Sequence, residues 1–207
     1  MSEALPSVPR KRRKSARPGE IVEAAAQSFI EHGYAGTKLD DVARRAGIAK
    51  GTIYLYFAAK QDLFEAVIRD TLEPLISGVE TMVDSYDGAT DILLQMVITK
   101  AYENIVQSDA RHVMRIIIGE GHKFPELREL YYETSIKHGV ALISRVVQRG
   151  VDRGEFRPGP ATQNPRLIMA PCIMAAIWSM TFDEFAPMDI DSFMAGHLDV
   201  MLNGLRA

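Results

Sequence analysis

Cysteine and long apolar runs are both scarce in this chain of 207 residues. The single cysteine, Cys172, excludes an intramolecular disulfide framework and favours a reducing, cytoplasmic compartment. The longest uncharged apolar run, from Leu167 to Phe182, has sixteen residues and contains Pro171. A membrane-spanning helix needs about 20 such residues, and no apolar stretch follows the basic residues near the N-terminus. We therefore expect no membrane partner and no secretory signal.

Signatures of catalysis are also missing from the sequence. The five histidines are scattered, and Glu120 and His122 are two residues apart, which does not place them on one face of a helix. There is no glycine-rich phosphate loop, no metal-ligand spacing and no nucleophile elbow. Cys172 lies among apolar residues, where an inert buried thiol is the common outcome. The sequence predicts no enzyme, no cofactor and no metal.

The formal net charge of only −3 conceals an asymmetry along the chain. Residues 1–60 contain eleven Lys and Arg against six Asp and Glu, whereas residues 61–207 contain thirteen against twenty-one. A basic front on an acidic body predicts that only the front contacts a polyanion.

Residues 1–17 are predicted to form a disordered basic arm. Six cations lie between Arg10 and Arg17, and the segment has neither a helical nor a strand period. Such an arm can enter the minor groove of DNA, raise nonspecific affinity for DNA, or serve only as a solubilising tail. The sequence leaves these three roles open.

From Pro18 onward the apolar residues recur with a helical period, and no segment alternates with a period of two over the length of a strand. About nine helices are expected, at approximately residues 18–33, 37–46, 50–57, 60–82, 89–107, 109–121, 125–153, 164–185 and 190–205. Thr37 is expected to cap the second helix and Gly33 to end the first. The prediction is an all-α fold with a head at residues 18–64 and a larger helical domain at residues 65–207.

Two short helices joined through Gly47 indicate a helix-turn-helix. Val42, Ala43 and Ile53 are apolar where the two helices must face each other, and glycine can adopt the left-handed conformation that the turn requires. The later helix of this pair, from Lys50 to Phe57, presents polar and aromatic side chains of the kind that enter the major groove. An ordinary helical hairpin inside a bundle is the alternative.

Residues 37–43, 47–57 and 60–64 together resemble the DNA-binding signature of the TetR-type (TetR/AcrR) family of transcriptional regulators. The resemblance covers about residues 18–66. It implies a three-helix DNA-binding domain, followed by a helical domain that dimerises and binds a small effector. Ala49 stands where the family often has Ser, and Leu55 stands where it often has His. Leu55 cannot hydrogen-bond to a base, although it can contact a thymine methyl group.

The resemblance also implies individual contacts with double-stranded operator DNA. The residues that it places at phosphates or base edges are Thr37, Lys38, Lys50, Gly51, Thr52, Tyr54, Leu55, Tyr56 and Lys60.

An effector pocket is expected among the helices between residues 89 and 185, because methionine and aromatic residues gather there and can line an adaptable apolar cavity. For any one of these residues a role in the core is the alternative. The candidates are Met96, Tyr102, His112, Arg115, His122, Phe124, Tyr132 and Trp178.

The last two helices carry apolar stripes too rich for a solvated surface, and they are the predicted homodimer interface. The residues expected there are Ile173, Ile177, Met180, Met194, Leu198 and Met201. The helix that starts at Lys60, kinked near Pro74, is the expected lever between the effector and the head.

The sequence therefore predicts a homodimeric repressor that a small apolar or amphipathic effector releases from a palindromic operator. The alternative is a ligand-binding or enzymatic helical protein with a non-functional DNA-binding head. Activation, or regulation without a ligand, is compatible with the same sequence.

Overall fold

The structure is a computed structural model that describes residues 18–207. The arm predicted for residues 1–17 lies outside the described residues. The prediction of an all-α fold is confirmed, since residues 18–207 contain one isolated bridge, between Phe156 and Arg206, and no β-strand. The helices are α1 (Pro18–Gly36), α2 (Leu39–Arg45), α3 (Lys50–Ile53), α4 (Lys60–Ser85), α5 (Thr90–Ala101), α6 (Ala110–Glu120), α7 (Pro125–Tyr131), α8 (Lys137–Asp152), α9 (Pro160–Gln163), α10 (Pro165–Thr181) and α11 (Ile190–Leu205).

Two π-helical segments interrupt the regular helices. The first, η1 (Tyr102–Val106), continues α5, and the second, η2 (Tyr132–Ile136), joins α7 to α8 in one continuous rod. Sequence periodicity predicts both rods at residues 89–107 and 125–153, but it does not reveal the π-helical segments. Single-turn π-helical insertions occur often at functional sites, and both segments here border the cavity described below.

The start of the second helix differs from the prediction. Lys38 is its N-terminal flanking residue and makes no side-chain cap, and the helix begins at Leu39. The hydroxyl of Thr37 points back to α1, where it donates to the carbonyl oxygens of Ser28 at 3.0 Å and Gly33 at 2.7 Å. Gly33, with φ at +68°, breaks α1 as its sequence position predicts, and helical structure then continues to Gly36.

The helix α3, which the sequence predicts to enter the major groove, is also shorter than expected. Regular α-helix covers only Lys50–Ile53, and the next residues form a turn in which the amide of Tyr56 donates to the carbonyl of Ile53 at 2.9 Å. The long helix α4 continues through Pro74 to Ser85. The short helix α9 and the loop at residues 182–189 were not expected from the sequence.

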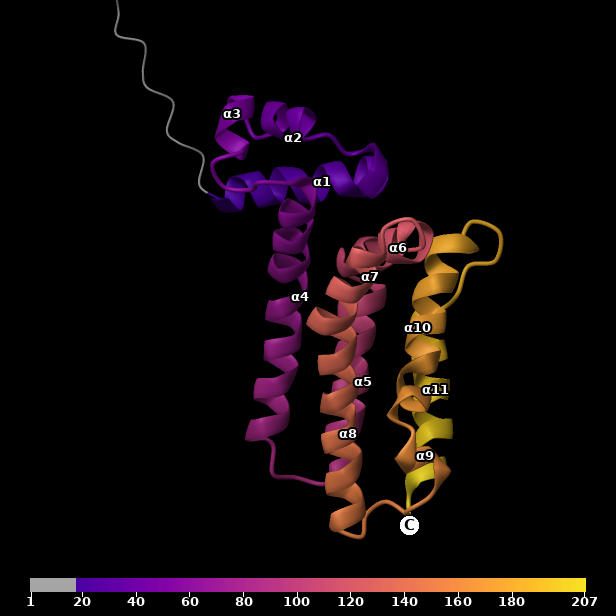
Figure 1. Cartoon of the computed structure of the whole chain (residues 1–207). Coiled ribbons are helices and arrows are strands. Elements are labelled where there is room, and N and C mark those ends of the chain that lie inside the picture. Colours follow the sequence, from indigo (N-terminus) through magenta and orange to yellow (C-terminus); the bar gives the residue numbers. More distant parts are fainter. Residues whose placement is uncertain (1–17) are drawn as a thin grey trace, which may run out of the picture.

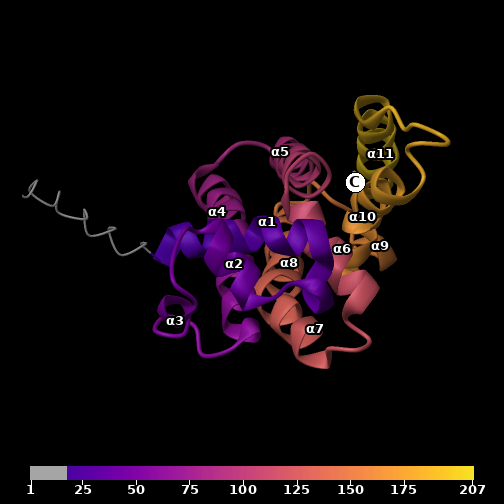
Figure 2. The same ribbon diagram turned by 90° about the horizontal axis from the view of Figure 1, so that it is seen from above.

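The head lies at one end of an elongated molecule (Figure 1). Helices α1 to α3 form the top, α4 descends from them, and α5, α8, α10 and α11 form the body, with α6 and α7 directly below the head. From above, α1 to α3 lie across the tops of α4 and α8, while α10 and α11 stand to one side (Figure 2).

Two buried apolar clusters correspond to the head and the body. The head cluster contains Phe29 and Phe64 and extends to Val113 and Leu127 of α6 and α7. The body cluster joins α5, η1, α8, α10 and α11. The head core therefore continues into α6 and α7, which gives the body a packed connection to the DNA-binding end. The division of the chain between residues 64 and 65 falls within α4 and stays a prediction.

Candidate DNA-binding face and effector cavity

The helix-turn-helix is held together by small and apolar side chains. Val42, Ala43 and Ile53 are buried between α1, α2 and α3. Gly47 has φ at +67°, and the amide of Ile48 donates to the carbonyl of Ala43 at 3.0 Å. The turn predicted from the sequence is therefore present, with glycine at the position that needs the left-handed conformation.

Three consecutive large side chains project from the turn after α3. The exposed fractions are 49% for Tyr54, 81% for Leu55 and 44% for Tyr56. Exposed aromatic and aliphatic groups are costly to leave in water unless a partner covers them. Lys38, Lys50 and Gly51 are exposed near them, and Thr52 is half-buried. These seven residues are accessible, and their contacts with DNA stay predictions.

Lys50 is paired within the protein while DNA is absent. Its ammonium lies 2.8 Å from a carboxylate oxygen of Asp40 in α2, and the hydrogen bond to Asp40 raises the pKa of Lys50. Both side chains are exposed, so the pair contributes little to stability. It holds the lysine close to α2.

The structure gives Thr37 and Lys60 a role different from the expected phosphate contact. Thr37 is buried, and its hydroxyl bonds to backbone carbonyls, as described above. The ammonium of Lys60 donates to the carbonyls of Tyr34 at 2.7 Å and Thr37 at 3.1 Å, and it lies 4.5 Å from the centre of the Tyr34 ring. Burial lowers the pKa of Lys60 against the opposing effect of Glu120. Both residues therefore stabilise the head in the absence of DNA, and their contacts with phosphate stay predictions.

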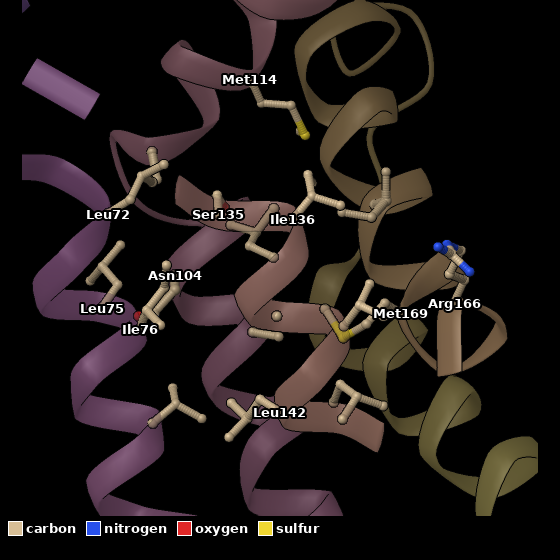
Figure 3. A pocket seen from close by; sticks show the side chains of 18 of the residues that line it. Leu72, Leu75, Ile76, Asn104, Met114, Ser135, Ile136, Leu142, Arg166 and Met169 are labelled. Carbon is tan, nitrogen blue, oxygen red and sulfur yellow. The ribbon is translucent and has the colours of Figure 1, made fainter. Parts of the chain in front are cut away.

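A cavity of about 500 Å³ lies in the upper half of the body. Its walls come from α4, α5, η1, α6, η2, α8 and α10, and its lining is almost entirely aliphatic. Figure 3 shows Leu72, Leu75 and Ile76 of α4 on one side, Met114 of α6 above, and Met169 and Arg166 of α10 on the other side. This size and apolar lining are typical of sites that bind small organic ligands.

Only a few polar side chains reach the cavity. Asn104 lies in η1, Tyr131 and Ser135 lie at the junction of α7 and η2, and Arg166 lies in the first turn of α10. Burial raises the pKa of Tyr131, against the opposing effect of a hydrogen bond with Ser135. The Asn104 side chain, by contrast, has no hydrogen-bond partner within residues 18–207. A few polar groups in an apolar cavity orient a ligand more than they hold it.

None of the eight residues predicted for the pocket is among those that line this cavity. Tyr102 is buried behind it, where its hydroxyl lies 3.1 Å from Nδ1 of His197. The Trp178 indole donates to the carbonyl of Ala186, and Phe124 packs on Tyr34 in the head. Tyr132 and His122 are exposed, whereas Met96 and His112 are half-buried away from the cavity, and Arg115 bonds to α1. Apart from α4, the helices that line this cavity are those among which a pocket was expected, but the lining residues differ from the expected ones.

Two residues expected at the dimer interface instead line the cavity. Ile173 and Ile177 face inward from α10, and Met201 is buried in the body core. Met180, Met194 and Leu198 are partly buried against that core. The outer surface of α10, α11 and the loop between them carries other exposed apolar side chains, namely Leu167, Met174, Phe182, Phe185 and Val200. The sequence signal was ambiguous here because α10 is apolar on all its faces.

Helix α6 connects the cavity to the head. Ala110 and Met114 line the cavity, while the carboxylate of Glu120 at the other end of α6 accepts hydrogen bonds from the amides of Tyr34 and Ala35, both at 2.7 Å. Arg115, between them, donates to the carbonyl of Ile30 at 2.8 Å. These contacts follow the break of α1 at Gly33, where backbone amides would otherwise lack partners.

We also searched the described residues for metal-binding clusters, membrane-spanning helices and a reactive cysteine. Within residues 18–207 no three His, Cys, Asp or Glu side chains are grouped to hold a metal ion. No helix in that range is long and apolar enough to span a membrane. Cys172 is fully buried, and burial raises the pKa of its thiol to about 12, so it is not a reactive thiolate.

Comparison with known proteins agrees with these features. The family model described as "Bacterial regulatory proteins, tetR family" matches residues 21–67, and one described as "Tetracyclin repressor-like, C-terminal domain" matches residues 88–193. The HTH-type transcriptional repressor KstR2 of Mycobacterium tuberculosis is 30% identical over 70% of this chain and 71% of its own length. The fatty acid metabolism regulator protein of Bacillus subtilis is 23% identical over 90% of this chain and 94% of its own.

Solved structures show the same fold. A TetR-family regulator from Mesorhizobium loti superposes with a TM-score of 0.78 at 21% identity, covering 95% of this chain and 100% of that one. The regulator FadR from Bacillus subtilis, in complex with stearoyl-CoA, gives 0.74 at 22% identity, covering 91% and 99%. The chain therefore belongs to the TetR family of bacterial regulatory proteins and is a ligand-responsive DNA-binding repressor.

Proposed function

We propose that this repressor acts as a homodimer on a palindromic operator in the cytoplasm and is released when a molecule with an acyl chain occupies the cavity between α4, α8 and α10. The observation that carries this proposal is the apolar cavity of about 500 Å³. The stearoyl-CoA bound by FadR, which has the same fold, supports the choice of an acyl chain. The role proposed is regulatory rather than catalytic, as in the rest of the family.

The volume of the cavity is suited to such a chain. A methylene group fills nearly the space of one water molecule, about 30 Å³, so about 17 chain carbons fit into the cavity of about 500 Å³. Each buried methylene contributes about 0.8 kcal/mol. Affinity is therefore expected to rise with chain length until the cavity is full.

We propose that α6 transmits occupancy to the head. A chain packed against Ala110 and Met114 pushes on α6, and Glu120 and Arg115 of the same helix bond to α1. The effector can shift the head only by its differential affinity for the two positions of α6. The lever predicted in α4 is compatible with this, since Leu72, Leu75 and Ile76 flank Pro74 and also line the cavity.

The homodimer is proposed from the outer face of α10 and α11. Leu167, Met174, Phe182, Phe185 and Val200 are exposed there in one protomer, with exposed fractions between 44% and 83%. A second copy that covers this face would remove these apolar groups from water. The interface proposed from the structure therefore consists of these outward residues rather than Ile173, Ile177 and Met201.

Filling the cavity tests the proposal. Gly139 of α8 lines the cavity, and a Cβ added there meets no atom within 4 Å. Gly139→Leu should keep operator affinity within about threefold and should improve helix propensity by about 1 kcal/mol. Release by lauroyl-CoA should need at least about tenfold more ligand, because a leucine side chain removes several methylenes' worth of contact.

The measurement is fluorescence anisotropy on DNA from upstream of the gene, at two salt concentrations. Gly78→Leu is the matched control, because Gly78 is an exposed helical glycine with equally open space that does not line the cavity. If lauroyl-CoA releases Gly139→Leu and Gly78→Leu equally well, the cavity is not the effector site. If the protein binds the upstream DNA no more tightly than random DNA, the upstream DNA does not contain its operator.

A further inference from the structure

Arg166 is the only charged residue among those that line the cavity. It lies in the first turn of α10, and its side chain is exposed. Within residues 18–207 its guanidinium has neither an ion-pair nor a hydrogen-bond partner. Neighbouring arginines on α8 are engaged: Arg145 pairs with Asp84 at 3.0 Å, and Arg149 donates to the carbonyl of Tyr86. A cation left unpaired at the edge of an apolar cavity is available to pair with an anion from outside the chain.

The cavity opens to solvent beside this arginine. Ala170, one turn further along α10, lines the cavity and is exposed, and so is Ile136 of η2 across the opening. Figure 3 shows Arg166 on the α10 side, across the cavity from the side chains of α4. A ligand whose chain reaches Leu72 and Leu75 therefore leaves its polar end near Arg166.

A second recess on the other side of Ile76 would be unfavourable for an anion. It is bordered by Glu73 and Glu80 of α4 and by Glu133 of η2. Its one arginine, Arg69, is already paired with Glu73 at 2.8 Å and with Glu65 at 2.9 Å. The two sides of the cavity therefore differ in charge, and only the α8–α10 opening attracts a negative group.

We propose that the effector is an amphipathic anion whose negatively charged end is held by Arg166 at the opening between α8 and α10, with its chain directed toward α4. This rests on the proposed function and adds the charge and the direction of the ligand. The shared chemistry is an aliphatic chain with an anionic end. That end is either the carboxylate of a free fatty acid or the phosphates of an acyl thioester carrier.

Binding of three probes with the same twelve-carbon chain, with dodecylamine as a cationic fourth, tests this. Laurate has a carboxylate, 1-dodecanol has no charge, and lauroyl-CoA has phosphates. The full-length dimer should bind the anions about 5- to 20-fold tighter than dodecanol, which is the range for a charge-assisted contact at a partly solvated site. Arg166→Gln should reduce that preference to about twofold or less, and Arg166→Glu should favour dodecylamine over laurate. Arg145→Gln, on α8 but paired outside the cavity, should keep the wild-type preference.

Calorimetric titration of each probe, followed by operator release, separates the outcomes. A preference for laurate or lauroyl-CoA that disappears in Arg166→Gln supports the proposal, and the anion that loses more affinity identifies the source. If dodecanol binds and releases the operator as well as the anions do, the charge assignment is overturned while the proposed function stands. A preference that survives in Arg166→Gln also overturns it. If no probe binds to the wild-type cavity, the proposed function itself fails.

Discussion

Lys60 shows how a lysine at a DNA-binding surface can serve the fold instead of the ligand. Its ammonium closes the C-terminal end of α1, where the carbonyls of Tyr34, Ala35 and Thr37 have lost their helical partners. A positive charge at the carbonyl end of a helix is also favoured by the helix dipole. The same ammonium rests on the Tyr34 ring, which belongs to the aromatic core of the head.

Replacing this ammonium should therefore affect the stability of the fold more than the affinity for the operator. Lys60→Met keeps the length of the side chain and removes the donors, so the free energy of unfolding should fall by about 1–2 kcal/mol. Thermal unfolding of the head, followed by circular dichroism, measures this. Tyr54→Ala is the contrasting variant, because Tyr54 is half exposed and should lose operator affinity without a change in melting temperature. If Lys60→Met melted like the wild type and lost only DNA binding, the phosphate contact would be its role.

Residue-level prediction from the sequence succeeded where the local pattern decides exposure. Tyr54 and Leu55 follow the buried Ile53 in a short helix, and the structure exposes both. It did not anticipate the backbone partners of Thr37 and Lys60, which are carbonyls near or just after the end of α1. The residues that line the cavity could not be predicted either, because they too depend on contacts between helices that are distant in sequence. Met96 and Met169 have similar sequence surroundings, and only the packing of α10 against α8 decides which of them meets the ligand space.

At the level of elements, α6 is the piece that both sites share. It is a helix of eleven residues that borders the cavity near its start and bonds to the head at its end. The Glu120 carboxylate lies so close to Gly33 that a Cβ there would clash with Oε1. Only glycine is therefore compatible with this contact, and its positive φ reinforces that requirement.

Glu120→Ala should uncouple the effector from the operator. The two amides of Tyr34 and Ala35 lose a charged acceptor, which costs about 1–3 kcal/mol for the contact between α6 and α1. We expect the variant to bind lauroyl-CoA nearly as well as the wild type does. The factor by which lauroyl-CoA weakens operator binding should, however, be at least about tenfold smaller than in the wild type. Paired measurements of ligand affinity and of operator affinity with and without ligand give this factor.

Glu129→Ala is the matched control, because Glu129 is an exposed glutamate on α7 outside both the cavity and this contact. An unchanged factor in Glu120→Ala would show that α4, rather than α6, transmits occupancy.

The positions of elements were largely predictable, and their irregularities were not. The rods at residues 89–107 and 125–153 were predicted because apolar residues keep a helical register through them. A π-helical turn inserts one residue and rotates the apolar face by about 100°. The apolar stripes that predicted the rods lie before η1 and from the end of η2 onward, so neither stripe records that rotation. The recognition segment was predicted as a helix to Phe57, but its apolar residues satisfy a turn equally well after Ile53.

For the whole molecule, the charge asymmetry acquires a structural meaning. The described part of the DNA-binding end, residues 18–60, has five Lys and Arg against five Asp and Glu, and Lys50 is paired with Asp40. One head of balanced charge binds a polyanion weakly. Two heads held at a fixed spacing by a dimer gain from effective concentration, so affinity for a palindrome depends on the α10–α11 face.

Breaking that face should therefore reduce operator binding without touching either site. Val200 of α11 is 73% exposed in one protomer and does not line the cavity, so Val200→Glu should not disturb folding or ligand affinity. A glutamate at a covered apolar interface is buried without a partner, and the dimer should dissociate. Sedimentation equilibrium should show a monomer near 23.0 kDa, and operator affinity should fall by about 100-fold or more.

Ile118→Glu is the control for oligomeric state, because Ile118 is 58% exposed on α6 outside this face. If Val200→Glu stays dimeric while Ile118→Glu dissociates, the interface lies on the α6 side of the body and the apolar face of α10 and α11 has another partner.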